Sequence, residues 1–132
     1  MIMTKKCENI ITFINESLYV KYSKSTWWID SGATVHVANS LQGFCSTRTT
    51  QRSERHVKVA NRVQAEVEAV GDLTLELADG FKLLLRDVLY VPSLQRNLIS
   101  VSCLDNDGYD CHFRNDKCKI TFNNACVGLA IL

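Results

Sequence analysis

The sequence has almost no net charge, because 15 lysines and arginines are balanced by 14 aspartates and glutamates. Proteins that bind nucleic acid without sequence preference draw on a strong positive field, which this composition does not supply. We therefore expect no direct contact with nucleic acid. The mixed charges of residues 52–58, RSERHVK, are interpreted as a solvated face.

Long apolar runs are also missing. No stretch approaches the roughly 18 residues of a membrane span, and residues 1–9 are polar where a signal peptide would need its apolar region. We expect a soluble protein in a reducing compartment, with no membrane partner. A length of 132 residues fits one domain with a modest core.

The six cysteines include no CxxC pair, and zinc sites usually begin from such a close pair of ligands. Cys111 and His112 are adjacent, so alternation along a strand would point their side chains to opposite faces. We therefore expect no metal and no cofactor. The cysteines are predicted to be scattered small core residues or free thiols: Cys7, Cys45, Cys103, Cys111, Cys118 and Cys126.

Apolar and polar residues alternate with the period of a β-strand over residues 63–70, VQAEVEAV. Together with residues 57–60, VKVA, this stretch predicts a hairpin that turns near Asn61. Further strands are predicted over 27–29, 73–77, 81–91, 109–113, 117–122 and 126–132. Gly71-Asp72 and Asp79-Gly80 are expected to be connections between strands, and Pro92 to end the strand before it.

A single short helix is expected, because Leu94, Leu98 and Val101 are spaced as one face of a helix before the turn at residues 105–108. The first 24 residues show no clean period and are interpreted as a linker or a weakly formed edge. The predicted class is all-β with one short helix, and residues 25–132 are expected to form the domain.

One carboxylic acid has an unusual setting. Asp30 follows the apolar residues Trp27, Trp28 and Ile29 and precedes three small residues, Ser31-Gly32-Ala33. A strand this apolar would carry Asp30 into the core, where a lone acid costs several kcal/mol unless it is paired or protonated. A protein that keeps such an acid is expected to give it a partner.

That partner could be the same acid from a second copy of the chain. Two carboxyl groups sharing one proton have apparent pKa values forced apart, which leaves one ionised and one neutral. The ionised group can take a proton from a water molecule while the neutral group donates to a substrate carbonyl. The expected reaction is peptide hydrolysis without a covalent intermediate.

Other candidate residues give weaker signals. Asp-Ser-Gly alone is common in turns and helix caps. His36 has no serine or cysteine nucleophile placed with it, so we expect a structural hydrogen-bonding role. No second acid follows an apolar strand in this way; Asp72, Asp79 and Asp107 each adjoin a glycine and a predicted turn.

Three stretches together resemble the protease region of copia-type retrotransposon polyproteins over residues 25–132: WWIDSGATVHVANS, VKVANRVQAEVEAVGDLTLEL and LLLRDVLYVPSLQRNLISVSCLDNDGYDCHF. The resemblance implies a retropepsin-like closed β-barrel half that acts as a homodimer. Each half would contribute one aspartate to the active site and one hairpin flap over the peptide substrate.

The resemblance also implies roles for individual residues. Asp30 matches the catalytic acid, Ser31 the hydroxyl residue that bonds across the two-fold axis, and Gly32 the backbone position facing the paired acids. Ala33 completes the motif at the substrate. Arg96 and Asn97 match a supporting Arg-Asn pair at the start of the expected helix.

The flap of the family corresponds to the predicted hairpin. Its tip would place Asn61, Arg62 and Val63 against the substrate. Arg62 occupies a position where copia-type sequences often have glycine, and Gln95 likewise replaces a glycine before the Arg-Asn pair.

Two functions remain open. The first is a dimeric aspartic endopeptidase that processes the retrotransposon polyprotein containing it, in the cytoplasm within a virus-like particle. The second is a catalytically inactive retropepsin-like module that only dimerises or holds a peptide through main-chain pairing. The intact Asp30-Ser31-Gly32 favours the first function, and Arg62 and Gln95 favour the second.

Overall fold

The computed structural model describes residues 4–7, 26–58, 64–77, 82–114, 117–122 and 125–131. Within these residues the chain forms three β-sheets, one short α-helix and a 3-10 turn, which confirms the mostly-β prediction with one helix. The elements are β1 (Thr4–Cys7), β2 (Trp27–Asp30), β3 (Val37–Ala38), β4 (Phe44–Arg48), η2 (Arg52–Glu54), β5 (His56–Lys58), β6 (Gln64–Glu66), β7 (Ala69–Glu76), β8 (Lys82–Tyr90), β9 (Asn97–Ser100), α1 (Val101–Asn106), β10 (Tyr109–Arg114), β11 (Lys117–Phe122) and β12 (Ala125–Ile131).

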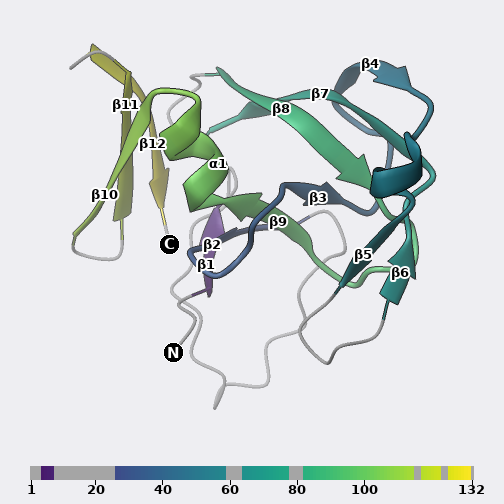
Figure 1. Cartoon of the computed structure of the whole chain (residues 1–132). Coiled ribbons are helices and arrows are strands. Elements are labelled where there is room, and N and C mark those ends of the chain that lie inside the picture. Colours follow the sequence, from purple (N-terminus) through teal and green to yellow (C-terminus); the bar gives the residue numbers. More distant parts are fainter. Residues whose placement is uncertain are drawn as a thin grey trace.

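The main sheet has seven strands in the order β1-β2-β9-β3-β8-β7-β4 (Figure 1). β2 lies between β1 and β9 and pairs in parallel with β9, so that Asp30 stands opposite Ser100. Trp27, Trp28 and Ile29 are all buried. Burial on both faces explains why β2 reads as a continuous apolar run rather than as an alternating strand.

The sheet is open within the described residues, since β1 and β4 form its two edges. β3 pairs in parallel with β8, and β8 and β4 both pair antiparallel with β7. The closed barrel half expected from the family resemblance is therefore wrong for this part of the chain. A closed barrel needs a continuous ring of hydrogen bonds between strands, which the described strands do not form.

Three antiparallel strands, β10, β11 and β12, form a separate sheet beside α1 (Figure 1). Their bounds match the three strands predicted after the helix. β5 and β6 form a third, two-stranded sheet in which Val57 faces Ala65, as predicted for the hairpin.

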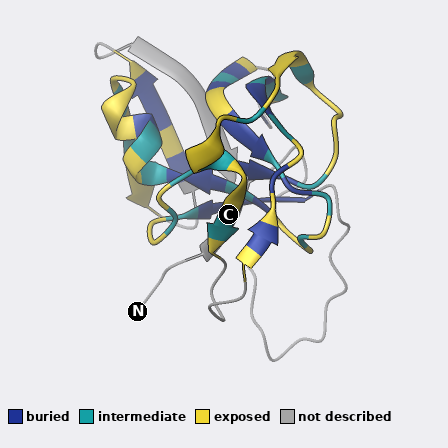
Figure 2. Cartoon of the chain, turned by 45° about the vertical axis from the view of Figure 1, so that its right-hand side comes forward, coloured by how far each residue is buried: buried dark blue, intermediate teal, exposed yellow. Residues whose placement is uncertain are grey.

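The core consists of two apolar clusters, and Figure 2 shows the buried residues concentrated along the central strands. The larger cluster joins the main sheet to Leu104 of α1 and Ile120 of β11. The smaller cluster lies under the hairpin, where Ala65 and Val67 pack with residues of β3 and β8. Each of the two smaller sheets is thus attached to the main sheet through its own apolar contact.

The helix begins later than its apolar spacing predicts. Residues 97–100 form β9, and α1 starts only at Val101. Pairing with β2 holds residues 97–100 extended, and the Ser100 side chain then accepts a hydrogen bond from the backbone N–H of Cys103 as the N-cap. Tertiary pairing outweighs the local period here.

Gly71-Asp72 does not separate two strands, because β7 continues through it. A β-carbon at Gly71 would collide with the carbonyl oxygen of Ser46 on β4, so glycine permits the two strands to approach closely. The β7–β8 register shifts between Gly71 and Leu73, which places Asp72 at a bulge rather than at a turn. The short strands β3 and β4 were not predicted.

At the N-terminal end of the described chain, β1 pairs with β2 at the edge of the main sheet. The predicted linker otherwise falls on residues outside the description, as does the predicted turn at Asp79-Gly80. Among the described helices, none has the length and apolarity to cross a membrane.

Candidate functional site

Asp30 is the last residue of β2 and is partly buried. Its Oδ1 accepts a hydrogen bond of 2.8 Å from the backbone N–H of Gly32. The carbonyl oxygen of Asp30 also accepts a 3.4 Å bond from the N–H of Ala33, which closes a tight turn. The buried strand and this turn fix both the position and the direction of the carboxylate.

The other motif residues lie on the loop after Asp30. Ser31 and Gly32 are exposed, and Ala33 is half-buried. A carboxylate that ends a buried strand therefore sits beside residues that solvent reaches. The sequence grouping of Asp30, Ser31, Gly32 and Ala33 is retained in space as one surface loop.

This loop is attached to the start of α1. The Ser100 hydroxyl donates a 2.7 Å hydrogen bond to the carbonyl oxygen of Ala33, and the Cys103 thiol donates to the carbonyl oxygen of Thr34 at 3.1 Å. Ser102 makes a longer contact of 3.4 Å with the same Ala33 oxygen. Loop 31–35 is thus held from below by residues that lie almost 70 positions later.

His36 occupies a fully buried position behind the loop, with 1% of its surface exposed. Its Nδ1 accepts a 2.9 Å hydrogen bond from the backbone N–H of Ser100, which confirms the predicted structural role. Acceptance at Nδ1 places the proton of the neutral ring on Nε2. Nε2 has no hydrogen-bond partner among the described residues, and burial lowers the pKa of His36 to about 4.

Asn97 connects three segments beneath the site. Its Oδ1 accepts a 2.7 Å hydrogen bond from the N–H of Asn39, and its Nδ2 donates to the carbonyl oxygen of Thr26 at 3.1 Å. Asn39 in turn donates from Nδ2 to the carbonyl oxygen of Leu94. These bonds join the entry to β2, the exit from β3 and the start of β9.

Arg96 lies over the ring of Trp28, with its guanidinium carbon 4.3 Å from the ring centroid. Trp28 precedes Asp30 by two residues and is buried, so Arg96 covers the strand that carries the acid. Arg96 and Asn97 are placed to support β2 and β9, the two strands that carry the site.

The expected substrate residues Asn61, Arg62 and Val63 lie outside the described residues. The hairpin that carries them is described at its base, where β5 and β6 pair from His56–Glu66 to Lys58–Gln64. The N–H of Val67 donates a 2.9 Å bond to the carbonyl oxygen of Arg55, which extends the pairing toward the main sheet.

Comparison with known proteins identifies the family of this chain. A family model described as the β-barrel domain of Pol polyproteins matches residues 27–109. The chain belongs to the Pol polyprotein β-barrel domain family. The match spans the strand that carries Asp30, the hairpin, β9 and α1.

Two curated relatives of this Pol β-barrel domain are plant retrotransposon proteins. The chain is 33% identical over 98% of its length to the retrovirus-related Pol polyprotein from transposon TNT 1-94 of Nicotiana tabacum, and 33% identical over 70% of its length to that from transposon RE1 of Arabidopsis thaliana. It spans only 10% and 6% of the length of these two proteins. No solved structure matches the chain significantly.

The side chains of four cysteines of the Pol β-barrel domain are described, and none of the four forms a disulfide: Cys45, Cys103, Cys111 and Cys118. Cys111 is half-buried while His112 is exposed, as strand alternation predicts. A hydrogen bond with Cys118 lowers the pKa of the Cys111 thiol. Within the described part of the chain, no three potential ligands are grouped as a metal site would require.

The sequence interpretation missed two groups that hold the site. Ser100 forms hydrogen bonds with Ala33 of the loop and with His36, and its side chain also caps α1. A serine directly before the helix is the only local signal for that cap. Asn39 lies on the short segment after β3 and bonds Asn97 across 58 positions of sequence. Such long-range pairs leave no period in the sequence.

Proposed function

We propose that this Pol β-barrel domain is one subunit of a homodimeric aspartic endopeptidase that cleaves a retrotransposon polyprotein. The observation that carries the proposal is the setting of Asp30, which ends a buried strand and receives the backbone N–H of Gly32 at 2.8 Å. The homology to Pol polyproteins supports the choice of a polyprotein as the peptide substrate.

One chain supplies one such acid, so the reaction needs the Asp30 of a second copy. The two carboxyl groups would share a proton, because like charges at close range cannot both ionise. The ionised Asp30 would take a proton from the attacking water, and the neutral one would donate to the peptide carbonyl oxygen. The residues that hold loop 31–35 would keep the two acids correctly placed relative to each other. The proposed reaction needs no cofactor.

The proposed roles of the neighbouring residues follow from their placement. Ser31 is exposed next to Asp30 and would bond across the two-fold axis, and the Gly32 backbone would face the paired acids. Ala33 and the hairpin tip at Asn61, Arg62 and Val63 would contact the peptide. Arg96 and Asn97 would act indirectly, by holding β2 and β9.

The proposed dimer would be formed by the chain ends. β12 pairs with β11 along one edge, and β1 lies at an edge of the main sheet. Among the described strands neither β1 nor β12 has a partner on its second side, so each leaves backbone groups that another strand could pair with. The proposed location is the cytoplasm, within a virus-like particle.

The test is cleavage of a polyprotein fragment at mildly acidic pH by the purified chain, with and without pepstatin. We expect Asp30→Asn to abolish cleavage while the circular dichroism spectrum and the dimer are retained, because the substitution keeps size and removes the shared proton. Asp107→Asn is the control, since Asp107 is another aspartate next to a glycine but is exposed and lies just after α1. It should leave cleavage unchanged.

Assembly gives a second readout in the same assay. Specific activity should fall on dilution, because a single chain holds only half of the proposed site. Full cleavage by the Asp30→Asn protein, or by a monomer at nanomolar concentration, would reject the proposal. A dimer that binds the peptide without cleaving it would instead favour the inactive module.

A further inference from the structure

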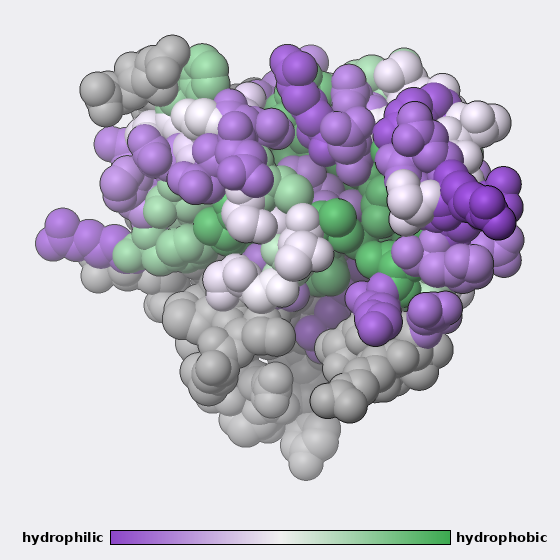
Figure 3. Space-filling view, viewed as in Figure 1, coloured by the Kyte–Doolittle hydropathy of each residue, from purple (hydrophilic) through white to green (hydrophobic). Residues whose placement is uncertain are grey.

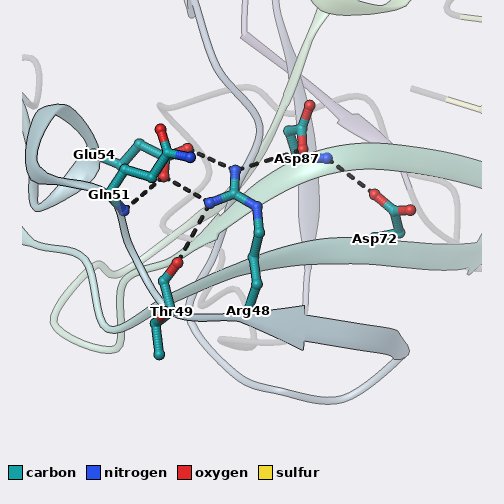
Figure 4. A network of polar contacts seen from close by, with 6 residues as sticks. All are labelled: Arg48, Thr49, Gln51, Glu54, Asp72 and Asp87. Carbon is teal, nitrogen blue, oxygen red and sulfur yellow. Dashed lines mark hydrogen bonds and ion pairs between the residues drawn. The ribbon is translucent and has the colours of Figure 1, made fainter.

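A second polar cluster lies away from Asp30, where β4, η2, β7 and β8 come together (Figure 4). Arg48 at the end of β4 forms two parallel hydrogen bonds with Glu54 of η2, from Nη1 to Oε1 and from Nη2 to Oε2, each 2.7 Å long. Glu54 Oε1 also accepts a 2.9 Å bond from the backbone N–H of Gln51. The Glu54 carboxylate is therefore bonded both by the Arg48 side chain and by the backbone of the 3-10 turn that contains it.

The same arginine reaches the bulge of the main sheet. Arg48 Nη2 lies 3.8 Å from Oδ1 of Asp87, and the N–H of Asp87 donates a 3.2 Å bond to Oδ1 of Asp72 (Figure 4). Asp72 and Asp87 stand on paired strands at the point where the register shifts. Arg48 thus connects η2 to a fixed irregularity of the β7–β8 pair.

This cluster is located at the base of the hairpin. η2 ends at Glu54, Arg55 follows, and β5 begins at His56. The carbonyl oxygen of Arg55 accepts the N–H of Val67, so the two arms of the hairpin are closed one residue beyond the ion pair. Polar side chains dominate this part of the surface, at the right of Figure 3.

The cluster contributes more to the orientation of the chain than to the free energy of folding. The Arg48 side chain is 44% exposed, and exposed ion pairs add little to the free energy of folding. A planar guanidinium bonded to both carboxylate oxygens nevertheless fixes direction as well as distance. An arginine of this kind orients the turn that leads into β5.

The cluster also stays ionised in acid. The two bonds from Arg48 and the bond from Gln51 lower the pKa of Glu54 to about 2. The other charged groups that face Arg48 are Asp72 and Asp87, and both are acids. Protonation of Glu54 therefore does not release Arg48 at mildly acidic pH.

We propose that Arg48 and Glu54 are positioning residues that fix the base of the β5–β6 hairpin against β4 and the β7–β8 bulge, and so set the direction in which the hairpin leaves the main sheet. The part of this inference that concerns peptide binding rests on the proposed function. The part that concerns the hairpin base is independent of any activity.

The experiment measures hydrogen exchange of the backbone amides of residues 55–58 and 64–67 in the full chain. Arg48→Met and Glu54→Gln should each speed exchange by about threefold at the hairpin base, the size expected for an exposed ion pair, while exchange in β2 and β9 is unchanged. Arg48→Lys should restore only part of the protection, because lysine keeps the charge but not the paired bonds. Arg114→Met, an exposed strand arginine on β10, is the control and should change nothing.

Peptide kinetics test the peptide-binding part with the same four variants. A misdirected hairpin should raise KM several-fold for Arg48→Met and Glu54→Gln while kcat changes less, with Arg48→Lys between them and the wild type. Unchanged exchange at the hairpin base would overturn the whole inference. Faster exchange with an unchanged KM would reject the peptide-binding part, and an absence of cleavage by the wild type would reject only the proposed function.

Discussion

Beneath the Asp30 loop, the central polar contacts are made by neutral groups that are buried, whereas at the hairpin base they are made by charged groups in contact with water. Asn97, Ser100 and His36 are 2%, 0% and 1% exposed. Arg48 and Glu54 have side chains that are 44% and 23% exposed. Burying a charged group costs much free energy, whereas burying a neutral amide costs little once the amide is hydrogen-bonded. Neutral groups therefore form the buried network, and charged groups form the exposed one.

Both networks contain a group with a lowered pKa, but the causes are opposite. Burial lowers the pKa of His36 to about 4, because the charged imidazolium would lose its hydration. Hydrogen bonds from Arg48 and Gln51 lower the pKa of Glu54 to about 2, because they favour the ionised carboxylate. As the pH falls, protonation of His36 therefore disturbs the network under Asp30 before protonation of Glu54 disturbs the network at the hairpin base.

The largest effect is expected from Asn97, which joins three segments of the buried network. Asn97→Ala leaves the N–H of Asn39 and the carbonyl oxygen of Thr26 without this partner inside the protein. Leaving one buried and one half-buried polar group without this partner should lower the free energy of unfolding by about 3 kcal/mol. Urea denaturation measures the change.

Asn106→Ala is the control for Asn97, because Asn106 is an exposed asparagine on α1. It should change the free energy of unfolding by less than about 0.5 kcal/mol. A loss below about 1 kcal/mol for Asn97→Ala would mean that the segments remain satisfied by other groups, and the contrast between the two networks would disappear.

The second prediction uses pH to separate the networks. The pKa of His36 falls from 6.5 to about 4 on folding, so the unfolded chain binds more protons between these values. Stability contributed by neutral His36 is complete above about pH 6.5 and is lost as the pH falls. The full loss below pH 4 is about 3 kcal/mol. Denaturation across this range measures it.

His36→Gln removes the titrating group, and the pH dependence of its unfolding free energy should be flatter than that of the wild type. His56→Gln is the control, because His56 is exposed on β5. It should leave the wild-type pH dependence intact. Parallel pH profiles for wild type and His36→Gln would show that His36 is not the group that titrates.

The same contrast explains what could be predicted from the sequence. Alternation over residues 63–70 predicts the hairpin, which is confirmed at its base where β6 covers residues 64–66, whereas residues 69–70 begin β7 of the main sheet. The apolar run before Asp30 predicts a buried strand that ends at an acid, and β2 confirms it. Both signals are local: alternation reports a strand with one buried face, and an unbroken apolar run reports a strand buried on both faces. The last three strands were predicted from another local signal, the turn residues that divide them.

The contacts that hold the site were not accessible in this way. Leu94, Leu98 and Val101 have helical spacing, yet β2 draws residues 97–100 into the sheet. Gly71 reads as a turn residue, although its use is to let Ser46 of β4 approach. In both cases a partner distant in sequence determines the conformation, so the conformation cannot be predicted from the neighbouring residues alone.

The smallest effect is expected at Asp87, where the charged network includes strained backbone. Asp87 has φ of 53°, a left-handed conformation that costs about 1 kcal/mol for most residues and less for aspartate. Asp87→Gly removes this strain, and it also removes a carboxylate 3.8 Å from Arg48 that is 79% exposed. An exposed pair at that distance contributes little.

Glycine also gains freedom in the unfolded chain, which offsets part of the relief. We therefore expect Asp87→Gly to raise the free energy of unfolding by about 0.5 kcal/mol, measured as a small rise in Tm. Asp87→Asn tolerates the same φ and removes only the charge, so it should leave Tm nearly unchanged. If both variants lower Tm, the Asp87 carboxylate stabilises Arg48 by more than an exposed pair should, and the charged network is stiffer than its exposure implies.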